Sequence, residues 1–219
     1  MSERFFVSNR PAPRAVDAAE VAFDVDLGPS LLEDADLFLV SDFIASSERA
    51  HWLERLRKEI PFAGSTIHMF GREIPEPRLT SWHGDSNAVY TYSKSRRVPL
   101  PWTSGLTDLR GKIERTAAAT FNSVLANLYR DGRDSMGFHA DREPELGPNP
   151  TIASLSLGFE RAIVFQHRSD KLKRLKMLLP SGSLLVMGMH VQDRYRHAIP
   201  KVREASPRLN LTFRNVTSI

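Results

Sequence analysis

The sequence contains no cysteine. The chain therefore forms no disulfides and has no thiolate ligands or cysteine nucleophile, so any bound metal must be held by histidine and carboxylate side chains. It also lacks an apolar run long enough to span a membrane, and residues 1–7 lack the continuous apolar region of a secretory signal peptide. Together these absences favour a cytoplasmic enzyme.

The 219 residues suffice for one catalytic domain with a substantial core. Thirty lysines and arginines against 26 acidic residues give a formal net charge of +4. A basic balance suits a protein that binds nucleic acid or another anion, although many proteins with this balance bind neither. Nothing in the sequence indicates an obligate oligomer, so we expect a monomer.

The chain divides into an arm and one domain. Residues 1–30 combine prolines and arginines with an acidic, alanine-rich run and are expected to form a loose N-terminal arm. Residues 31–219 form the predicted catalytic domain. The aromatic and proline-punctuated segment 65–102 indicates short strands and hairpins.

Two helices are predicted from apolar residues at helical spacing. In the first, Ser46 or Ser47 serves as the N-cap and Pro61 ends the helix. Its expected buried residues are Ala50, Leu53, Leu56 and Ile60. The second spans residues 103–120, and its expected buried residues are Leu106, Leu109, Ile113 and Ala117.

Short strands follow the second helix. The predicted strands are residues 124–130, 152–158, 162–167, 176–179, 183–188 and 209–216, after an earlier one at 36–40. Two helices followed by many short strands indicate an α+β fold, with a β-sandwich or jelly roll backed by helices.

Two histidines and a carboxylate form a candidate metal site. His139 and Asp141 are two positions apart, so on an extended backbone their side chains share one face, and His197 lies downstream. Two histidines and one carboxylate with open coordination positions suit a non-haem Fe(II) oxygenase. The tripeptide is common, however, and isolated histidines are more often hydrogen-bonded or exposed.

The segment Arg208–Arg214 alternates polar and apolar side chains without interruption. Its polar face carries Arg208, Asn210, Thr212 and Arg214. Arginine binds carboxylates through paired hydrogen bonds, so this face could hold a dicarboxylic acid. The same pattern also fits the solvated face of an edge strand. Asn127 and Tyr129 share a strand face upstream and could contact the far end of the same acid.

In this order, these motifs resemble the AlkB family of Fe(II)- and 2-oxoglutarate-dependent nucleic-acid dealkylating dioxygenases, and the pattern is most similar to its double-strand-preferring members. The matching elements are Asn127-x-Tyr129-x-Asp131-Gly132, His139-x-Asp141, His197 and Arg208-x-Asn210-x-Thr212-Phe213-Arg214. The resemblance runs from about Phe70 to the C-terminus.

The resemblance implies a double-stranded β-helix (jelly-roll) core at about residues 121–219 and a nucleotide-recognition lid at about residues 62–102. It implies Fe(II) held by His139, Asp141 and His197. The cosubstrate 2-oxoglutarate would be bound by Asn127, Tyr129, Arg208, Asn210, Thr212 and Arg214. We expect Arg208 on its distal carboxylate and leave open which end Arg214 contacts.

The resemblance also implies a base pocket. Tyr92, with Tyr90 on the same strand face, would stack on a flipped-out base against His139, and Glu143 would accept from its exocyclic amine. Phe70 would fill the gap that the flipped base leaves in a duplex. Arg72 and Arg78 would lie near phosphates or the opposite strand.

The implied reaction is oxidative repair of bases such as 1-methyladenine and 3-methylcytosine in DNA or RNA. An alternative is a hydroxylase or demethylase of the same chemistry that acts on protein or on RNA modifications and does not use Phe70, Tyr92 or Glu143. A binding module that has lost catalysis is a third hypothesis, and the presence of every expected ligand argues against it.

Overall fold

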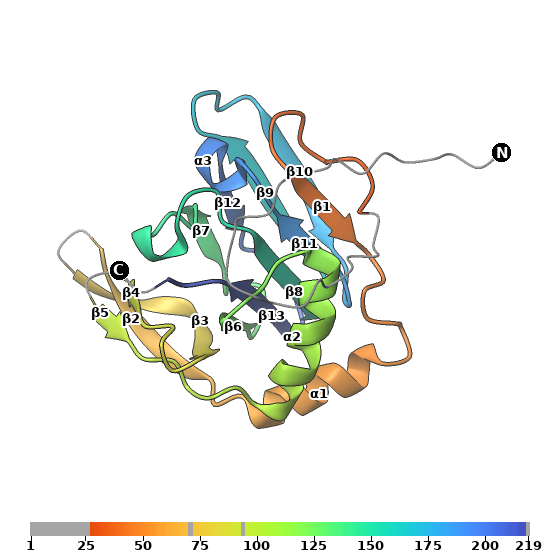
Figure 1. Ribbon diagram of the computed structural model, residues 1–219, viewed down its shortest axis with the longest axis vertical. Coiled ribbons are helices and arrows are strands. Elements are labelled where there is room, and N and C mark those ends of the chain that lie inside the picture. Colours follow the sequence, from red (N-terminus) through yellow and green to blue (C-terminus); the bar gives the residue numbers. More distant parts are fainter. Residues whose placement is uncertain (1–26, 70–71, 93–94, 218–219) are drawn as a thin grey trace, which may run out of the picture.

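The computed structural model describes residues 27–69, 72–92 and 95–217. Most of the predicted arm and Phe70 lie outside these residues. Two antiparallel sheets make up the body of the described chain (Figure 1). In order across the larger sheet, the described strands are β1 (Leu37–Val40), β11 (Leu184–Met187), β8 (Ile152–Gly158), β13 (Arg208–Arg214), β6 (Ser123–Tyr129), β3 (Arg72–Gly84) and β2 (Ala63–Met69).

The smaller sheet and the helices complete the described fold. The smaller sheet is β10 (Arg174–Leu179), β9 (Arg161–His167), β12 (Tyr195–Ile199) and β7 (Met136–His139), and a separate pair joins β4 (Tyr90–Tyr92) to β5 (Ser95–Arg97). The helices are α1 (Arg49–Glu59), α2 (Ser104–Ala117), the short α3 (Val191–Arg194) and a 3-10 turn at Pro144–Leu146. Within the described residues, no helix is both long and apolar enough to cross a membrane.

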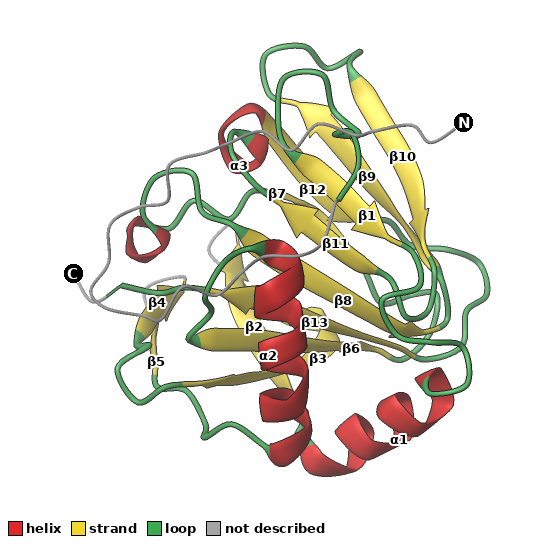
Figure 2. Cartoon of the chain, turned by 45° about the vertical axis from the view of Figure 1, so that its right-hand side comes forward, coloured by secondary structure: helices red, strands yellow, loops and turns green. Residues whose placement is uncertain are grey.

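Helices α1 and α2 cover one face of the larger sheet, and the smaller sheet lies on its other side (Figure 2). The helix side is an apolar core in which Leu209, Leu211 and Phe213 of β13 are fully buried against residues of both helices. A second apolar cluster lies between the sheets and includes Phe165 and Tyr195. The α+β prediction of a jelly roll backed by helices is confirmed.

Helix α2 has the predicted buried residues: Leu106, Leu109, Ile113 and Ala117 all lie in the core. Thr103 caps its N-terminus by accepting a hydrogen bond from the Leu106 backbone N–H. The helix ends at Ala117, three residues before the predicted boundary, because Ala118 adopts a left-handed conformation.

The prediction for α1 was wrong in two respects. The N-cap is Glu48, which makes no side-chain cap, rather than Ser46 or Ser47. Leu56 and Ile60 are buried and Leu53 packs partly buried against the core, as predicted, but Trp52 is also buried and Ala50 is exposed. The large indole of Trp52 rotates the buried stripe toward itself because it offers far more apolar surface than alanine.

Strand β13 lies in the interior of the larger sheet, between β8 and β6. Every one of its residues is buried, so the alternative of a solvated edge strand is excluded. Strands β7 and β12, which carry His139 and His197, were not predicted as strands. They are short, and a bulge between them interrupts the alternation that marks a strand in sequence.

Candidate functional site

A pocket lies between the two sheets, and the polar side chains of β13 face β7 and β12 across it. The larger sheet supplies most of its polar lining, and the smaller sheet and the loop after β7 supply the two histidines and the acids Asp141 and Glu143. The polar side chains that line it are Glu76, Arg78, Thr80, Asn127, Tyr129, His139, Asp141, Glu143, Ser154, His197, Arg208, Asn210, Thr212 and Arg214.

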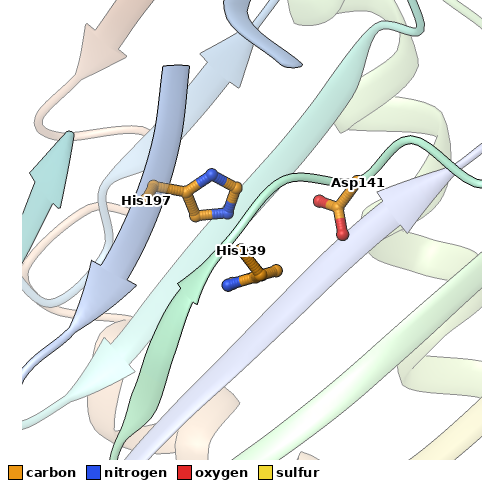
Figure 3. A group of neighbouring side chains, drawn as sticks. All are labelled: His139, Asp141 and His197. Atoms are coloured by element: carbon orange, nitrogen blue, oxygen red, sulfur yellow. The ribbon is translucent and has the colours of Figure 1, made fainter. Parts of the chain in front are cut away.

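The structure brings His139, Asp141 and His197 together at this pocket (Figure 3). One ligand atom from each side chain lies within 4.8 Å of the others. His139 and His197 are cross-strand partners on β7 and β12, which places their ring centroids 4.3 Å apart. Asp141 follows in the loop after β7, and its backbone N–H donates to Gln192 Oε1 at 2.9 Å. Two chain segments, β7 with the loop after it and β12, thus bring three side chains to one point.

The protonation of this group suits a cation. Burial lowers the pKa of His197 to about 3, with the neighbouring His139 acting in the same direction, so the imidazole is neutral and can donate a lone pair. Burial alone would raise the pKa of Asp141, but the positive charge of Arg214 and the hydrogen bond that it donates outweigh this effect and keep that pKa below its ordinary value. A neutral imidazole and an ionised carboxylate are the forms that bind metal.

Buried polar atoms around this point lack partners among the described residues. Asp141 Oδ2 and His197 Nδ1 are both buried without a hydrogen bond. His139 differs, because its Nδ1 lies 2.9 Å from the Gly137 carbonyl, which fixes the ring and leaves Nε2 for a ligand. A metal bound by nitrogen and oxygen ligands would satisfy such atoms, so the residues present fit the implied ion.

Arg208 presents an equally unusual arrangement at the other end of β13. Its side chain is 1% exposed, and its Nη2 donates to Ser156 Oγ at 2.9 Å, but Nε and Nη1 make no hydrogen bond within the part of the chain that the structure describes. Its Cζ lies 5.1 Å from the centre of the Tyr129 ring. A buried guanidinium without a carboxylate is costly, so the site fits an anionic ligand that approaches Nε and Nη1.

Arg214 occupies the opposite end of the same strand face. Its Nη2 donates to Asp141 Oδ1 at 3.0 Å, and both side chains are buried. The two arginines of β13 therefore differ in environment. Arg214 neutralises the carboxylate beside the histidines, whereas Arg208 carries an uncompensated charge at the far end of the pocket.

The amide and hydroxyl groups between the arginines hold one another in place. Asn210 Nδ2 donates to Ser154 Oγ at 2.8 Å, and Thr212 Oγ1 donates to Asn210 Oδ1 at 3.1 Å. Asn127 is the cross-strand partner of Asn210, and its Oδ1 accepts from Arg78 Nε at 2.8 Å. The structure thus brings the four β13 side chains together with Asn127 and Tyr129, as the sequence predicts.

The expected position of Arg78 was wrong. Instead of lying near phosphates or the opposite strand, it is 5% exposed and points into the pocket. It holds the amide of Asn127 and lies 3.5 Å from the buried carboxylate of Glu76, which also accepts from Ser65 at 2.7 Å. A guanidinium on this face of β3 finds these two partners within the fold and needs no phosphate.

The remaining base-pocket residues divide into two groups. Glu143 lines the pocket, and its buried Oε2 makes no hydrogen bond to any residue that the structure describes. Phe70 and the side chains of Arg72, Tyr90 and Tyr92 lie outside the described part of the molecule, so their assigned roles stay predictions. The backbones of Tyr90 and Tyr92 pair with β5.

Sequence reasoning missed four polar positions of the site. Ser154 and Ser156 on β8 and Glu76 and Thr80 on β3 are all buried at the pocket face. The serines alternate with Ala153, Leu155 and Leu157. The period-two alternation that identified the polar face of β13 could therefore have identified these serines as well. Glu76 lies between two prolines, and this context gives no comparable signal.

The facing sheets, the paired histidines with an ionised carboxylate and the buried arginine define the site of a non-haem iron oxygenase. The model of the 2OG-Fe(II) oxygenase superfamily matches residues 36–214. Alpha-ketoglutarate-dependent dioxygenase alkB homolog 3 of Mus musculus is 36% identical over 216 residues, covering 94% of this chain and 74% of the relative. DNA oxidative demethylase ALKBH2 of Mus musculus is 35% identical over 172 residues, covering 74% and 72%.

A solved structure described as the structure of OsALKBH1 has the same fold, with a TM-score of 0.62 at 17% identity, covering 85% of this chain and all of that one. The chain belongs to the 2OG-Fe(II) oxygenase superfamily and, within it, to the AlkB family. It is therefore a dioxygenase that depends on Fe(II) and 2-oxoglutarate.

Proposed function

We propose that this dioxygenase removes alkyl groups oxidatively from damaged nucleic-acid bases such as 1-methyladenine and 3-methylcytosine. The relatives named as a DNA oxidative demethylase support this substrate class. The observation that carries the proposal is a single pocket in which a metal-binding group, an uncompensated arginine and an unpaired glutamate oxygen lie together.

In this proposal His139, Asp141 and His197 hold Fe(II). Their ligand atoms are within mutual reach, and the ionised Asp141 and the neutral His197 are already in the forms that bind a cation. When bound, Fe(II) and 2-oxoglutarate activate O2 to hydroxylate the N-alkyl carbon, yielding succinate and CO2, and a methyl lesion then leaves as formaldehyde. The chain supplies position and exclusion of water.

Arg208 binds the distal carboxylate of 2-oxoglutarate. Its Nε and Nη1 are donors without a hydrogen-bond partner among the described residues, and a carboxylate has the paired oxygens to satisfy both. Asn127, Tyr129, Asn210 and Thr212 line the path between Arg208 and the histidines. Arg214 acts at the metal end through Asp141 rather than at the distal carboxylate.

Glu143 favours a cationic base. Methylation at N1 of adenine or N3 of cytosine places a positive charge on the ring, which the nearby carboxylate attracts, and its unpaired oxygen can accept from the exocyclic amine. The neutral parent base lacks the charge attraction. Tyr92 and His139 as stacking partners, and Phe70 as a wedge in duplex DNA, are proposed from the family resemblance.

The direct test is repair of oligonucleotides that carry 1-methyladenine or 3-methylcytosine, followed by mass spectrometry in the presence of Fe(II) and 2-oxoglutarate. We expect restored bases with wild type and none with His139→Ala. His51→Ala removes an exposed histidine from α1 and should leave repair unchanged. Turnover of 2-oxoglutarate without repair would contradict the proposed substrate. If the protein demethylates a methylated peptide and the Tyr92→Ala variant keeps this activity, the alternative of a protein-directed enzyme is favoured.

Substrate charge and strand form refine the test. Glu143→Gln should lower kcat/KM for cationic 3-methylcytosine more than for a neutral alkylated base, while Glu160→Gln, in the exposed β8–β9 turn, should change neither.

Comparing the repair of duplex and single-stranded oligonucleotides tests the wedge role proposed for Phe70. The segment Lys201-Val202-Arg203-Glu204 carries two basic residues and one acidic residue, so we expect no strong preference for duplex. Monomeric state and cytoplasmic location also stay predictions.

A further inference from the structure

Arg161 is a buried cation that the proposed chemistry does not use. It is the first residue of β9, and its side chain is 1% exposed. Its charge has no salt bridge to a carboxylate among the described residues, because the two nearest acids have other partners. Asp131 pairs with Arg133 at 2.7 Å and Asp134 with Arg130 at 2.8 Å.

The guanidinium of Arg161 donates hydrogen bonds to backbone carbonyls beside the ends of β6 and β12. Nη1 donates to the Asp131 carbonyl at 3.2 Å, and Nη2 donates to the carbonyls of Asp134 at 2.9 Å and Pro200 at 2.6 Å. Asp131 lies just beyond β6 of the larger sheet, and Pro200 directly follows β12 of the smaller sheet. Arg161 thus joins the two sheets at the end of the pocket where Tyr129 lies.

Tyr129 lies close to both buried cations. The centre of its ring is 5.7 Å from the Cζ of Arg161 and 5.1 Å from the Cζ of Arg208. An electron-rich ring is attracted to each guanidinium. The two cations also repel each other. Burial lowers the pKa of Arg208, and the positive charge of Arg161 lowers that pKa further. Two positive charges therefore act where the distal carboxylate is assigned.

We propose that Arg161 is a positioning residue that makes the pocket select dianionic 2-oxo acids over monoanionic ones. It holds Tyr129 in place through the strand ends and adds a second positive charge behind Arg208. This inference rests on the assignment of Arg208 to the distal carboxylate. A fixed charge at this depth is poorly screened by solvent, so its effect on an anion reaches beyond direct contact.

The test is a binding comparison between 2-oxoglutarate and its 5-methyl ester. The two acids share the 2-oxo acid end and differ in size by one methyl group, but in the second an uncharged ester replaces the distal carboxylate. Calorimetry on the Mn(II)-loaded full-length protein gives the ratio of the two Kd values without turnover. Arg161→Gln should reduce the preference for the dianion by about tenfold, because one unit charge is removed from a buried site.

Arg161→Lys separates charge from geometry. Lysine keeps the charge but cannot reach three carbonyls with a planar fork, so it should retain most of the dianion preference while lowering the Tm of the ligand-free protein. Arg168→Gln, which removes an exposed cation just beyond β9, is the matched control and should leave the ratio unchanged.

The outcomes distinguish the role proposed for Arg161 from the assignment of Arg208 to the distal carboxylate. If wild type binds both acids equally, the assignment of Arg208 fails and Arg161 loses its role with it. If wild type prefers the dianion and folded Arg161→Gln keeps the full preference, only the role of Arg161 is overturned. Should Arg161→Gln fail to fold, the lysine variant decides, since loss of the preference in that folded, charged variant contradicts the inference.

Discussion

The two faces of the larger sheet bury side chains for opposite reasons. Toward α1 and α2, β13 presents Leu209, Leu211 and Phe213, which are fully buried in an apolar core. Toward the smaller sheet the same strand buries Arg208 and Arg214, 1% and 7% exposed. On the helix face, the buried apolar side chains pack against other side chains of the protein. On the pocket face, buried charged and polar atoms lack partners among the described residues, and a bound metal and a carboxylate would supply those partners.

This difference teaches that burial alone does not indicate a stabilising residue. Apolar burial contributes roughly 25 cal/mol for each Å² removed from water, whereas a buried guanidinium without a carboxylate lowers stability until a ligand arrives. Substitutions on the helix face should therefore reduce stability and spare chemistry. Substitutions on the pocket face should abolish chemistry and spare or improve stability.

The largest expected effect is on the pocket face. His197→Ala should reduce repair by about a hundredfold or more, because even changes beyond the direct ligands of a metal cost about 10–100-fold in affinity or activity. The far-ultraviolet circular dichroism should remain that of the folded protein. Repair by the variant above one tenth of the wild-type rate would show that His197 is not a metal ligand.

On the helix face, Leu109→Ala should lower the free energy of unfolding by about 2–5 kcal/mol, since Leu109 is fully buried between α2 and the sheet. Urea unfolding measures the change. At a temperature where the variant is folded, its kcat should match that of wild type. A selective fall in kcat would break the separation between the two faces.

Arg208→Met sharpens the comparison because it should act in opposite directions on binding and stability. Without ligand, the free energy of unfolding should rise by about 1–4 kcal/mol, as an apolar side chain replaces an uncompensated buried charge. Binding of 2-oxoglutarate should be lost. Arg115→Met on the exposed side of α2 is the control and should shift stability by less than about 0.5 kcal/mol. A marked destabilisation by Arg208→Met would mean that its charge is compensated within the fold.

The smallest effect concerns the contact between the helices. Glu59 at the end of α1 accepts from the Gly105 backbone N–H at 2.8 Å and from Arg55 at 2.8 Å. Burial would raise the pKa of Glu59, but these hydrogen bonds lower it to about 2 from an ordinary value of 4.5. Its stabilisation is therefore fully present above pH 4.5 and is lost as the pH falls toward 2.

Glu59→Gln should accordingly reduce stability by less than about 1 kcal/mol at neutral pH, since the pair is partly exposed. The difference from wild type should disappear between pH 4.5 and 2 in chemical denaturation. A difference that does not change with pH would contradict the assigned ionisation.

Alternation and order along the chain predicted most of the fold and the centre of the site. The pattern of β13 identified both its apolar core face and its polar pocket face, and α2 could be predicted from its four buried residues and Thr103. Local patterns failed where contacts are made only in the folded state. Arg78 points inward because Glu76 and Asn127 lie beside it, and β12 is a strand because β9 and β7 flank it.

The most direct test of the two-face account is thermal unfolding with Mn(II) alone and with Mn(II) plus 2-oxoglutarate, in wild type and Arg208→Met. We predict that wild-type Tm rises with the metal and rises again with 2-oxoglutarate, because each ligand supplies partners that the pocket face lacks. Arg208→Met should keep the first increase and lose the second. An unchanged Tm in wild type, or an equal second increase in both proteins, would contradict the account.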